Sequence, residues 1–314
     1  MTSTADRTHL RLPDLDRPIR LVASDLDGTL LVDHRTVSAR SVAAIDAAGA
    51  AGVPVVVATG RQVPQVPPLI RPAAIRYVVG SNGSIAGDLH TGEVLFEDLL
   101  PVATLLELAD FLTSAAPGVG FSAVRDHGAG HAAEPGYLDL LTPRERDGEW
   151  TVDVAPLPDV LGEPTLKLTA RHPRLSADDL LAVLAGSGLT GFHATTSGAP
   201  FLEIGNAGVT KASGVARLCD LLGVDRTEVA AFGDAKNDIE LLTWAGLGVA
   251  MGNAVPEALA AADWQTASSD DDGVARGIEL ILRAALTRGG RPSSRHPGLD
   301  PGSQRTTTPP SSRA

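Results

Sequence analysis

The chain has 314 residues, 43% of them hydrophobic, which is enough to build a core in one large domain or two modest ones. Its 26 basic and 38 acidic residues leave a net charge of −12, which argues against a general binder of nucleic acid or of anionic membranes. No run of about 18 apolar residues occurs, so the sequence predicts no membrane-spanning helix.

The ends of the chain differ in composition from its body. Residues 1–18 are polar and lack the apolar middle of a secretory signal, so we interpret them as an N-terminal extension of a cytoplasmic protein. Residues 287–314 are rich in Pro, Ser, Thr and Arg and are predicted to form a disordered basic tail. The single cysteine, Cys219, lies in an apolar helical pattern, where a buried thiol is expected.

Short apolar runs alternate with longer helical patterns along most of the chain. Residues 21–24 and 53–58 are predicted strands, and residues 38–51 between them are a predicted helix with Ser38 as its N-cap. A strand, a crossover helix and a second strand form a parallel sheet with helices on its faces. The pattern therefore predicts an α/β fold with a doubly wound parallel sheet of the Rossmann type. Further strands are expected at 77–80, 229–232 and 247–250, and further helices at 238–245 and 271–286.

The middle of the chain, residues 86–196, has a different pattern, with two helices, a loop-rich stretch and short strands. We expect it to form a small α+β domain inserted into a core domain built from residues 19–85 and 197–286. Ligands bind beyond the carboxyl ends of parallel strands, so the insertion is expected to cap that face of the core. The elements expected in the insertion are helices at 102–115 and 176–185 and strands at 150–154, 166–169 and 192–195.

Asp25 follows the first predicted strand directly, and Asp27 lies two residues further on, in the loop. Two carboxylates this close raise each other's pKa, unless a cation lies between them or one is ionised while the other is protonated. Both conditions suit phosphoryl transfer, in which an ionised Asp25 attacks phosphorus and a protonated Asp27 protonates the leaving oxygen. Taken alone, the Asp-x-Asp-Gly pattern fits an ordinary turn equally well.

Polar residues also follow the other predicted strands. Residues 59–61 (Thr-Gly-Arg), 81–83 (Ser-Asn-Gly) and 233–238 (beginning Gly-Asp) come after the second, third and fourth strands. Because the carboxyl ends of parallel strands meet at one edge of a sheet, four such ends predict a single site. Asp25 and Asp234 can then share one hard cation such as Mg²⁺, which prefers oxygen ligands.

Each of these residues also has a structural interpretation. Asp234 and Asp238 fit the N-cap and first turn of a helix, and Thr59 fits a cap on the turn after its strand. Lys211, at the start of a predicted helix, fits either a solvated lysine or a compact charge that screens Asp25 from an incoming phosphate. The positions of these side chains in the folded protein decide between a structural role and a role in a phosphate-binding or metal-binding site.

Taken together, these motifs resemble the haloacid dehalogenase superfamily of phosphohydrolases, and specifically its Cof-type branch, in which a large α/β cap follows the second motif. The resemblance covers about residues 20–286 and includes the later segments 248–254 and 272–275. The four motifs that match in order are the run 25–30 (Asp-Leu-Asp-Gly-Thr-Leu), Thr59, Lys211 and the run that begins at Asp234.

The resemblance implies a role for each motif residue, with Mg²⁺ as the cofactor. Asp25 would be the nucleophile, Asp27 the acid and base, and Lys211 the group that neutralises charge. The roles of Arg61 and Asn82 are left open. The implied phosphate-binding residues are Leu26, Thr59, Gly60 and Asn237, although Asn237 also fits a loop brace. The implied direct metal ligands are Asp25, the backbone carbonyl of Asp27, and Asp234. Asp238 would act indirectly, either by binding the metal through a water molecule or by hydrogen bonding to the direct ligands.

The cap is expected to choose the substrate, because the core motifs are occupied with the phosphoryl group. Aromatic residues make up only 4% of the chain, which favours sugar phosphates or similar polyols over nucleobases. A metal site built from His127, His131 and Glu134 is conceivable, but polar loop residues are the preferred interpretation. The polar residues of the loop-rich stretch are Asp126, His127, His131, Glu134, Tyr137 and Arg144.

The sequence therefore predicts a Mg²⁺-dependent phosphatase that hydrolyses a small phosphorylated metabolite through an aspartyl-phosphate intermediate. Two alternatives keep the same fold: a sugar phosphomutase, and a non-catalytic protein that binds a sugar phosphate. The joint presence of Asp25, Asp27, Lys211 and Asp234 favours an enzyme. The expected partner is the small phosphorylated metabolite, with no nucleic acid and no membrane, and nothing in the sequence predicts an oligomeric state.

Overall fold

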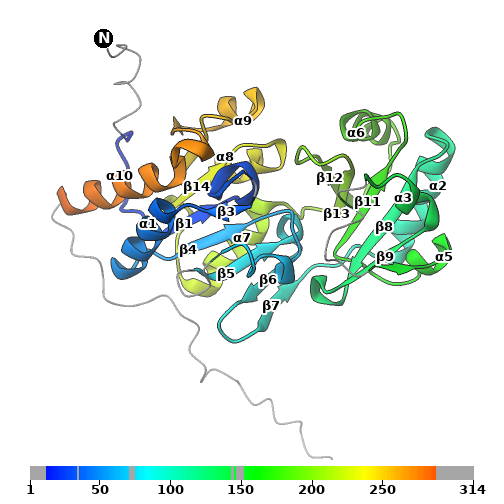
Figure 1. Ribbon diagram of the computed structural model, residues 1–314, viewed down its shortest axis with the longest axis horizontal. Coiled ribbons are helices and arrows are strands. Elements are labelled where there is room, and N and C mark those ends of the chain that lie inside the picture. The colour runs from blue at the N-terminus through cyan, green and yellow to red at the C-terminus, as the bar shows by residue number, and fades with distance from the viewer. Residues whose placement is uncertain (1–11, 34, 71–74, 143–144, 146–151, 288–314) are drawn as a thin grey trace, which may run out of the picture.

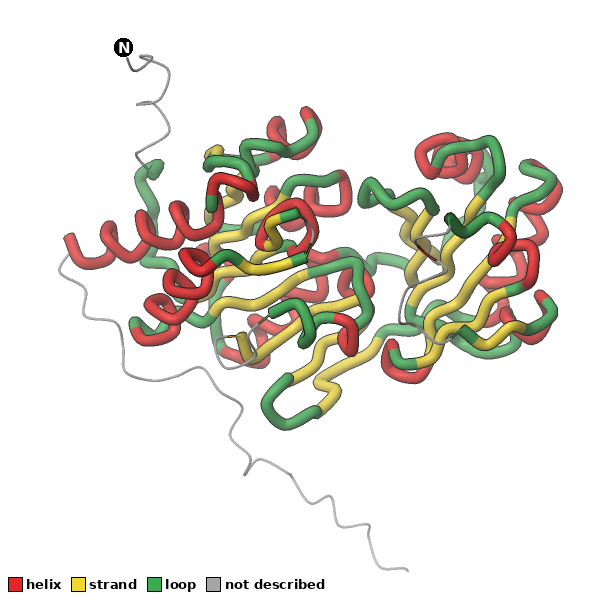
Figure 2. The backbone as a smooth tube through the Cα atoms, viewed as in Figure 1, coloured by secondary structure: helices red, strands yellow, loops and turns green. Residues whose placement is uncertain are grey.

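The computed structural model shows two β-sheets, each with helices packed against it, that lie next to each other (Figures 1 and 2). The predicted N-terminal extension is described only from residue 12, and the predicted tail only at residue 287. Within the described part of the chain, no helix is both long enough and apolar enough to cross a membrane. The described residues are 12–33, 35–70, 75–142, 145 and 152–287.

The larger sheet has eight strands in the order β16-β15-β14-β1-β4-β5-β6-β7. Its central strand β1 (Leu21–Ser24) pairs in parallel with β14 (Val229–Gly233) on one side and with β4 (Val55–Ala58) on the other. All three are fully buried, as strands covered on both faces must be, and they confirm the predicted parallel sheet. The other strands are β5 (Ile75–Gly80), β6 (Ile85–Asp88), β7 (Glu93–Glu97), β15 (Leu247–Ala250) and β16 (Trp264–Gln265), and a separate small hairpin contains β2 (Leu31–Val32) and β3 (Thr36–Val37).

Helices cover both faces of this sheet, because successive strand residues point to opposite sides. Val22 packs into one apolar cluster, whereas Leu21 and Ala23 pack into the cluster on the other face. The second cluster contains Cys219, whose burial raises the pKa of its thiol to about 12 and confirms the predicted buried cysteine. The helices on the Val22 side are α1 (Ala39–Ala50) and α10 (Gly273–Thr287), and those on the other side are α7 (Lys211–Leu222) and α8 (Ile239–Trp244), with α9 (Pro256–Ala261) next to α8.

The start of α7 is defined by a reciprocal cap. The hydroxyl of Thr210 accepts a hydrogen bond from the backbone N–H of Ser213, and the hydroxyl of Ser213 lies 2.9 Å from the backbone nitrogen of Thr210, which donates to it. Gly223 ends the helix in the left-handed conformation, with φ of 65°. This cap makes Lys211 the first residue of α7, at the edge of the sheet where the strands end.

The smaller sheet has six strands in the order β10-β9-β8-β11-β13-β12 and divides its residues between two unlike faces. Leu168 and Ala170 of β11 belong to an apolar cluster with the helices α2 and α6. The alternate residues Lys167, Thr169 and Arg171 are buried polar side chains that line a cavity instead. Its elements are α2 (Val102–Ala115), β8 (Gly120–Arg125), β9 (Gly130–Ala133), α3 (Pro135–Asp139), β10 (Asp153–Val154), α5 (Leu157–Val160), β11 (Lys167–Arg171), α6 (Ala177–Ala185), β12 (Phe192–Thr195) and β13 (Leu202–Asn206).

Strand pairing differs from the predicted domain boundaries at both ends of the insertion. Strands β6 and β7 cover most of the start of the predicted insertion, but they add to the larger sheet as an antiparallel hairpin beside β5. Strand β13 falls in the predicted core segment 197–286, but it pairs with β11 and β12 in the smaller sheet. A short apolar strand has no local mark of the sheet that it joins, because pairing is a tertiary contact. The first segment of the larger sheet therefore extends to residue 97, the smaller sheet extends to residue 206, and the larger sheet resumes with β14.

The predicted loop-rich stretch after α2 contains two strands of the smaller sheet, β8 and β9, and the short helix α3. These strands were missed because β9 is only four residues long and because both carry polar or small residues on the face toward the cavity, such as Ser122 and His131. The predicted strand at 150–154 is present as β10 at its end, and residues 150 and 151 lie outside the described residues.

Candidate active site

The predicted site residues meet at the carboxyl edge of the larger sheet. Asp25 follows β1, Thr59 follows β4 and Asp234 follows β14, and all three line a cavity of about 990 Å³. The opposite wall of this cavity is formed by the polar face of the smaller sheet, including Lys167 and Glu203. Asp25, Thr59 and Asp234 therefore lie together at the edge of the sheet where the sequence predicts the site.

The loop after β1 brings Asp25 against the end of β14. The backbone N–H of Asp25 donates to the carbonyl of Phe232 at 2.9 Å, and the side chain of Leu26 is fully buried in the core, so only its backbone can meet a phosphate. Gly28 has a φ of 78°, and a Cβ atom at this position would lie 2.5 Å from Asp234 Oδ2. The loop can approach Asp234 this closely only because residue 28 is glycine.

Lys211 lies between two carboxylates. Its Nζ donates to Asp25 Oδ1 at 2.5 Å and to Asp238 Oδ1 at 2.7 Å, and its side chain is only 1% exposed. Burial alone would lower the pKa of Lys211, but the carboxylates of Asp238 and Asp25 raise it above its ordinary value. The lysine is therefore a buried, charged group at the site and not a solvated one.

The cluster around Asp25 holds more negative than positive charge. Burial raises the pKa of Asp25 well above its ordinary value, Lys211 opposes this rise, and the carboxylates of Asp238 and Asp234 add to it. Among the described residues, the carboxylates of Asp25, Asp234 and Asp238 lie together, and one ammonium, that of Lys211, pairs with two of them. An additional cation is therefore electrostatically favoured at this position.

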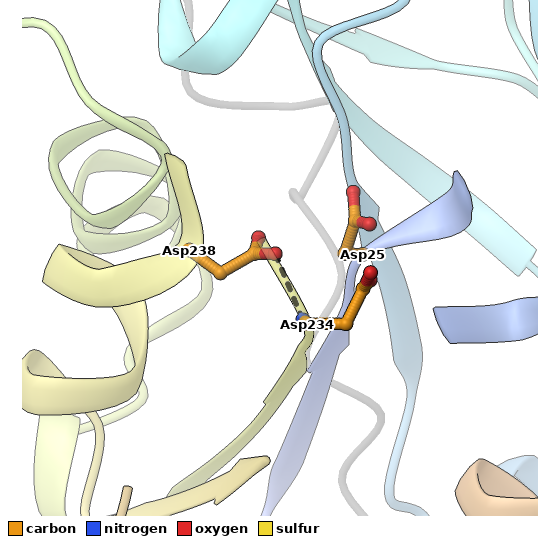
Figure 3. Close-up of side chains that lie close together, drawn as sticks. All are labelled: Asp25, Asp234 and Asp238. Atoms are coloured by element: carbon orange, nitrogen blue, oxygen red, sulfur yellow. Dashed lines mark hydrogen bonds between the residues drawn. The ribbon is translucent and has the colours of Figure 1, made fainter. Parts of the chain in front are cut away.

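The carboxylates of Asp25, Asp234 and Asp238 each offer an oxygen within 4.8 Å of the others (Figure 3). Thr29 Oγ1 donates to Asp234 Oδ1 at 2.6 Å, and Asp238 Oδ2 accepts hydrogen bonds of 3.0 Å from the backbone N–H groups of Asp234 and Ala235. These contacts orient the two acids. Carboxylate oxygens at this spacing fit a hard divalent cation such as Mg²⁺.

Asp27 faces the cavity in a bidentate pair with Arg61. Arg61 Nε and Nη2 donate to Asp27 Oδ2 and Oδ1, both at 2.6 Å, and each side chain is about a third exposed. The hydrogen bonds to Asp27 raise the pKa of Arg61, so the guanidinium stays charged. Arg61, whose role the sequence leaves open, thus holds the predicted acid and base in place.

Thr59 and Gly60 form the turn between β4 and Arg61. Thr59 is 1% exposed, and its Oγ1 accepts the backbone N–H of Arg61 at 3.1 Å, so it does cap this turn. Its hydroxyl hydrogen can still be donated to a ligand in the cavity that Thr59 lines. The carbonyl of Gly60 accepts a hydrogen bond of 2.7 Å from Lys167, which links this turn to the smaller sheet.

Asn237 and Asn82 meet beside the same turn. Asn237 Nδ2 donates to Asn82 Oδ1 at 3.0 Å, which supports the loop-brace interpretation of Asn237. Asn237 Oδ1 is buried and has no hydrogen-bond partner among the described residues, and Asn237 lines the cavity. Ser81 and Asn82 both have positive φ, 48° and 56°, a strained conformation that is often found at functional sites.

Among the described residues, His127, His131 and Glu134 form no group that could hold a metal ion. His127 Nδ1 lies 2.6 Å from Glu97 Oε1, Glu134 Oε1 accepts the backbone N–H of Phe121 at 2.8 Å, and His131 Nε2 hydrogen-bonds Ser122 Oγ. The three side chains thus serve different partners. Arg144 lies outside the described residues.

The polar face of the smaller sheet lines the same cavity, which was not predicted from the sequence. Lys167, Thr169 and Arg171 alternate along β11, and Glu203 lies on the neighbouring β13. The alternation of polar and apolar residues from 167 to 171 was a usable signal, since period-two patterning places the polar residues on one face. Glu203 alternates with Leu202 and Ile204 in the same way, but its strand falls in the predicted core segment 197–286, so the sequence did not place it beside β11.

Fold and site together define an α/β core with an inserted cap and an acidic, lysine-containing site at the carboxyl ends of parallel strands. A profile of the haloacid dehalogenase-like hydrolases matches residues 22–278 of the chain. YxeH of Bacillus subtilis (strain 168) is 31% identical over 281 residues, which are 84% of this chain and 98% of that protein. The 5-amino-6-(5-phospho-D-ribitylamino)uracil phosphatase YitU of the same organism is 30% identical over 279 residues, or 82% of this chain and 95% of its own.

Among solved structures, the HAD subclass IIB sugar phosphatase BT4131 shares this fold, with a TM-score of 0.71 at 23% identity, over 86% of this chain and 99% of that one. The chain belongs to the haloacid dehalogenase-like hydrolases and, within them, to the Cof-type branch. It is an enzyme, a hydrolase of phosphoric monoesters, as the motifs predicted.

Proposed function

We propose that this protein is a Mg²⁺-dependent phosphatase that hydrolyses a small phosphorylated metabolite, such as a sugar phosphate, through an aspartyl phosphate on Asp25. The observation that carries this proposal is the convergence of Asp25, Lys211 and Asp234 at the carboxyl ends of the parallel strands. The polar wall of the cavity opposite these residues supports a polar leaving group.

The acidic cluster supports Mg²⁺ as the cofactor. Asp25 and Asp234 would hold it, together with the backbone carbonyl of Asp27 and with Asp238 in a supporting position. When bound, Mg²⁺ supplies positive charge that offsets the charges of the phosphate and of the carboxylates. Thr29 contributes by fixing the orientation of Asp234 through a hydrogen bond of 2.6 Å.

In the first half-reaction, a carboxylate oxygen of Asp25 forms a bond to phosphorus while the bond between phosphorus and the leaving oxygen breaks. The carboxyl proton of Asp27 passes to the leaving oxygen. Lys211 orients Asp25 through its 2.5 Å hydrogen bond, and Thr59 can donate its hydroxyl to a phosphate oxygen.

In the second half-reaction, the carboxylate of Asp27 takes a proton from a water molecule whose oxygen bonds to phosphorus. The bond between phosphorus and Asp25 breaks, so inorganic phosphate leaves, Asp25 becomes a free carboxylate and Asp27 is protonated again. The bidentate hydrogen bonds from Arg61 hold the side chain of Asp27 in place at the cavity, where it can exchange this proton.

The test is phosphate release from a panel of phosphorylated metabolites, with Mg²⁺ or with excess EDTA, for the wild type and for Asp25→Asn. We expect Asp25→Asn to lower kcat by about a thousandfold or more, as loss of a nucleophile does. Asp46→Asn, an exposed aspartate on α1, is the matched control and should behave as the wild type. Turnover by Asp25→Asn, or full activity in EDTA, would contradict the proposal, and isomerisation without phosphate release would indicate a phosphomutase.

A further inference from the structure

The cap side of the cavity is lined by basic residues whose charges are already compensated. Lys167 Nζ donates to Glu203 Oε1 at 2.7 Å, and Arg171 Nη2 donates to Glu145 Oε1 at 2.6 Å. Burial lowers the pKa of His131 to about 4, with Lys167 adding to this effect, so the imidazole is neutral at neutral pH. The cap residues described here therefore offer a polar but nearly neutral wall to the leaving group.

Glu203 is the group on this wall whose hydrogen bonding is incomplete. Its side chain is 3% exposed, and Oε1 is bound by Lys167. Its other oxygen, Oε2, is buried and has no hydrogen-bond donor among the described residues, although Glu203 lines the cavity. A buried carboxylate oxygen without a donor is unfavourable, so a donor on a bound ligand would be strongly favoured here.

Contacts with the core place Glu203 close to the phosphate end of the cavity. The same ammonium that binds Glu203 also donates to the carbonyl of Gly60, the residue after Thr59. A Cβ atom on Gly60 would lie 3.2 Å from Glu203 Oε1. If the phosphate is bound at Thr59, the atoms of the leaving group that are next to the phosphate therefore lie near Glu203.

We propose that Glu203 is a specificity-determining residue that accepts, at Oε2, a hydrogen bond from a hydroxyl group of the leaving group near the phosphate. Lys167 is the positioning residue, because it binds Oε1 and ties Glu203 to the turn at Gly60. The proposal rests on the phosphatase function proposed above and deepens it. It selects neutral, hydroxyl-bearing leaving groups, because a carboxylate next to Oε2 would face the like charge of Glu203, and the ammonium of Lys167 is already bound to Oε1.

The test compares two substrates that differ only in hydroxyl groups: ribitol 5-phosphate and n-pentyl phosphate. We expect the ratio of their kcat/KM values to favour ribitol 5-phosphate in the wild type and to fall by roughly 10- to 100-fold in Glu203→Gln. The amide of Gln is neutral and, with its oxygen bound by Lys167, presents an N–H donor where Oε2 is a charged acceptor. Because the ratio is taken within one protein sample, partial unfolding of a variant cancels from it. Glu163→Gln, an exposed cap glutamate paired with Arg125, is the matched control and should keep the wild-type ratio.

A second variant covers the case in which Glu203→Gln leaves Lys167 unpaired and folds poorly. Lys167→Met with Glu203→Leu removes the whole buried pair, a replacement that proteins often tolerate, and it should lower the same ratio. An unchanged ratio in both variants would overturn the role of Glu203. Acetyl phosphate, an acyl phosphate whose small leaving group carries no hydroxyl, separates the two proposals. If the wild type with Mg²⁺ hydrolyses neither it nor any phosphomonoester, the phosphatase function fails, and the role of Glu203 fails with it. If acetyl phosphate is hydrolysed while the ratio is unchanged in both variants, only the role of Glu203 fails.

Discussion

Replacing Lys211 with methionine tests the electrostatics of the site most sharply. The ammonium of Lys211 is 1% exposed and lies 2.5 Å from Asp25 and 2.7 Å from Asp238, whose side chains are also buried. Methionine keeps the length of the side chain but removes its charge, so both carboxylates lose their buried partner. Removing one partner of a buried ion pair costs about 3–5 kcal/mol, and we expect Lys211→Met to lose stability in this range.

The matched control is Lys236→Met. Lys236 also donates to an aspartate, Asp178 Oδ2 at 2.8 Å, but these side chains are 36% and 57% exposed. An exposed pair of this kind contributes about 0–1 kcal/mol, so this variant should lose little stability. The assay is urea unfolding followed by circular dichroism at pH 7.5 in EDTA, with the unfolding free energies compared. Similar losses in Lys211→Met and Lys236→Met would refute the reasoning.

Three further predictions concern pH, backbone conformation and metal. Because the pKa of His131 is about 4 in the folded protein and 6.5 ordinarily, the unfolded chain binds more protons between these values, so the unfolding free energy should fall by about 2–3 kcal/mol as pH drops from 6.5 to 4. His131→Gln should lose this contribution, and an identical pH dependence in both proteins would contradict it. Gly28→Ala should destabilise by about 2 kcal/mol or more, because φ is 78° and its Cβ would meet Asp234, whereas Gly188→Ala, with φ of 72° and nothing within 4 Å, should cost about 1 kcal/mol; equal losses would rule out the contact with Asp234. MgCl₂ should raise the Tm of the wild type but not that of Asp234→Asn, because ligand that binds only the native state stabilises it, and an equal rise in both would argue against a site at Asp234.

The location of the site could be predicted because it follows from chain order and strand chemistry. The runs 21–24, 53–58 and 229–232 are too apolar to be anything other than buried strands, and the residues after them must lie at one edge of a parallel sheet. Asp25 and Asp234 needed no further information to be placed near each other. The position of Lys211 at the start of a helix was predicted from the sequence in the same way, and the structure confirms it.

The contacts that join distant segments could not be predicted in the same way. Arg61 pairs with Asp27 across 34 residues, and Lys167 pairs with Glu203 across two strands of a sheet whose order is not evident from the chain. Short strands such as β13 lie near a domain boundary in the sequence. The sheet that such a strand joins is known only from the strands with which it pairs. The cap residues that line the cavity could therefore be identified only from the structure, whereas the motif residues of the core could be identified from the sequence.

The central claim is that Asp25 carries the phosphoryl group during turnover. Asp27→Asn provides the direct measurement, because this variant lacks the base that activates water, and acetyl phosphate needs little help from an acid to form the phosphoenzyme. After mixing with Mg²⁺, acid quench and digestion, mass spectrometry should find one phosphoryl group on the peptide that contains Asp25, and none in the variant that also carries Asp25→Asn. An unmodified Asp25 peptide in Asp27→Asn under conditions in which the wild type hydrolyses acetyl phosphate, or a phosphoryl group on a different residue, would contradict the claim.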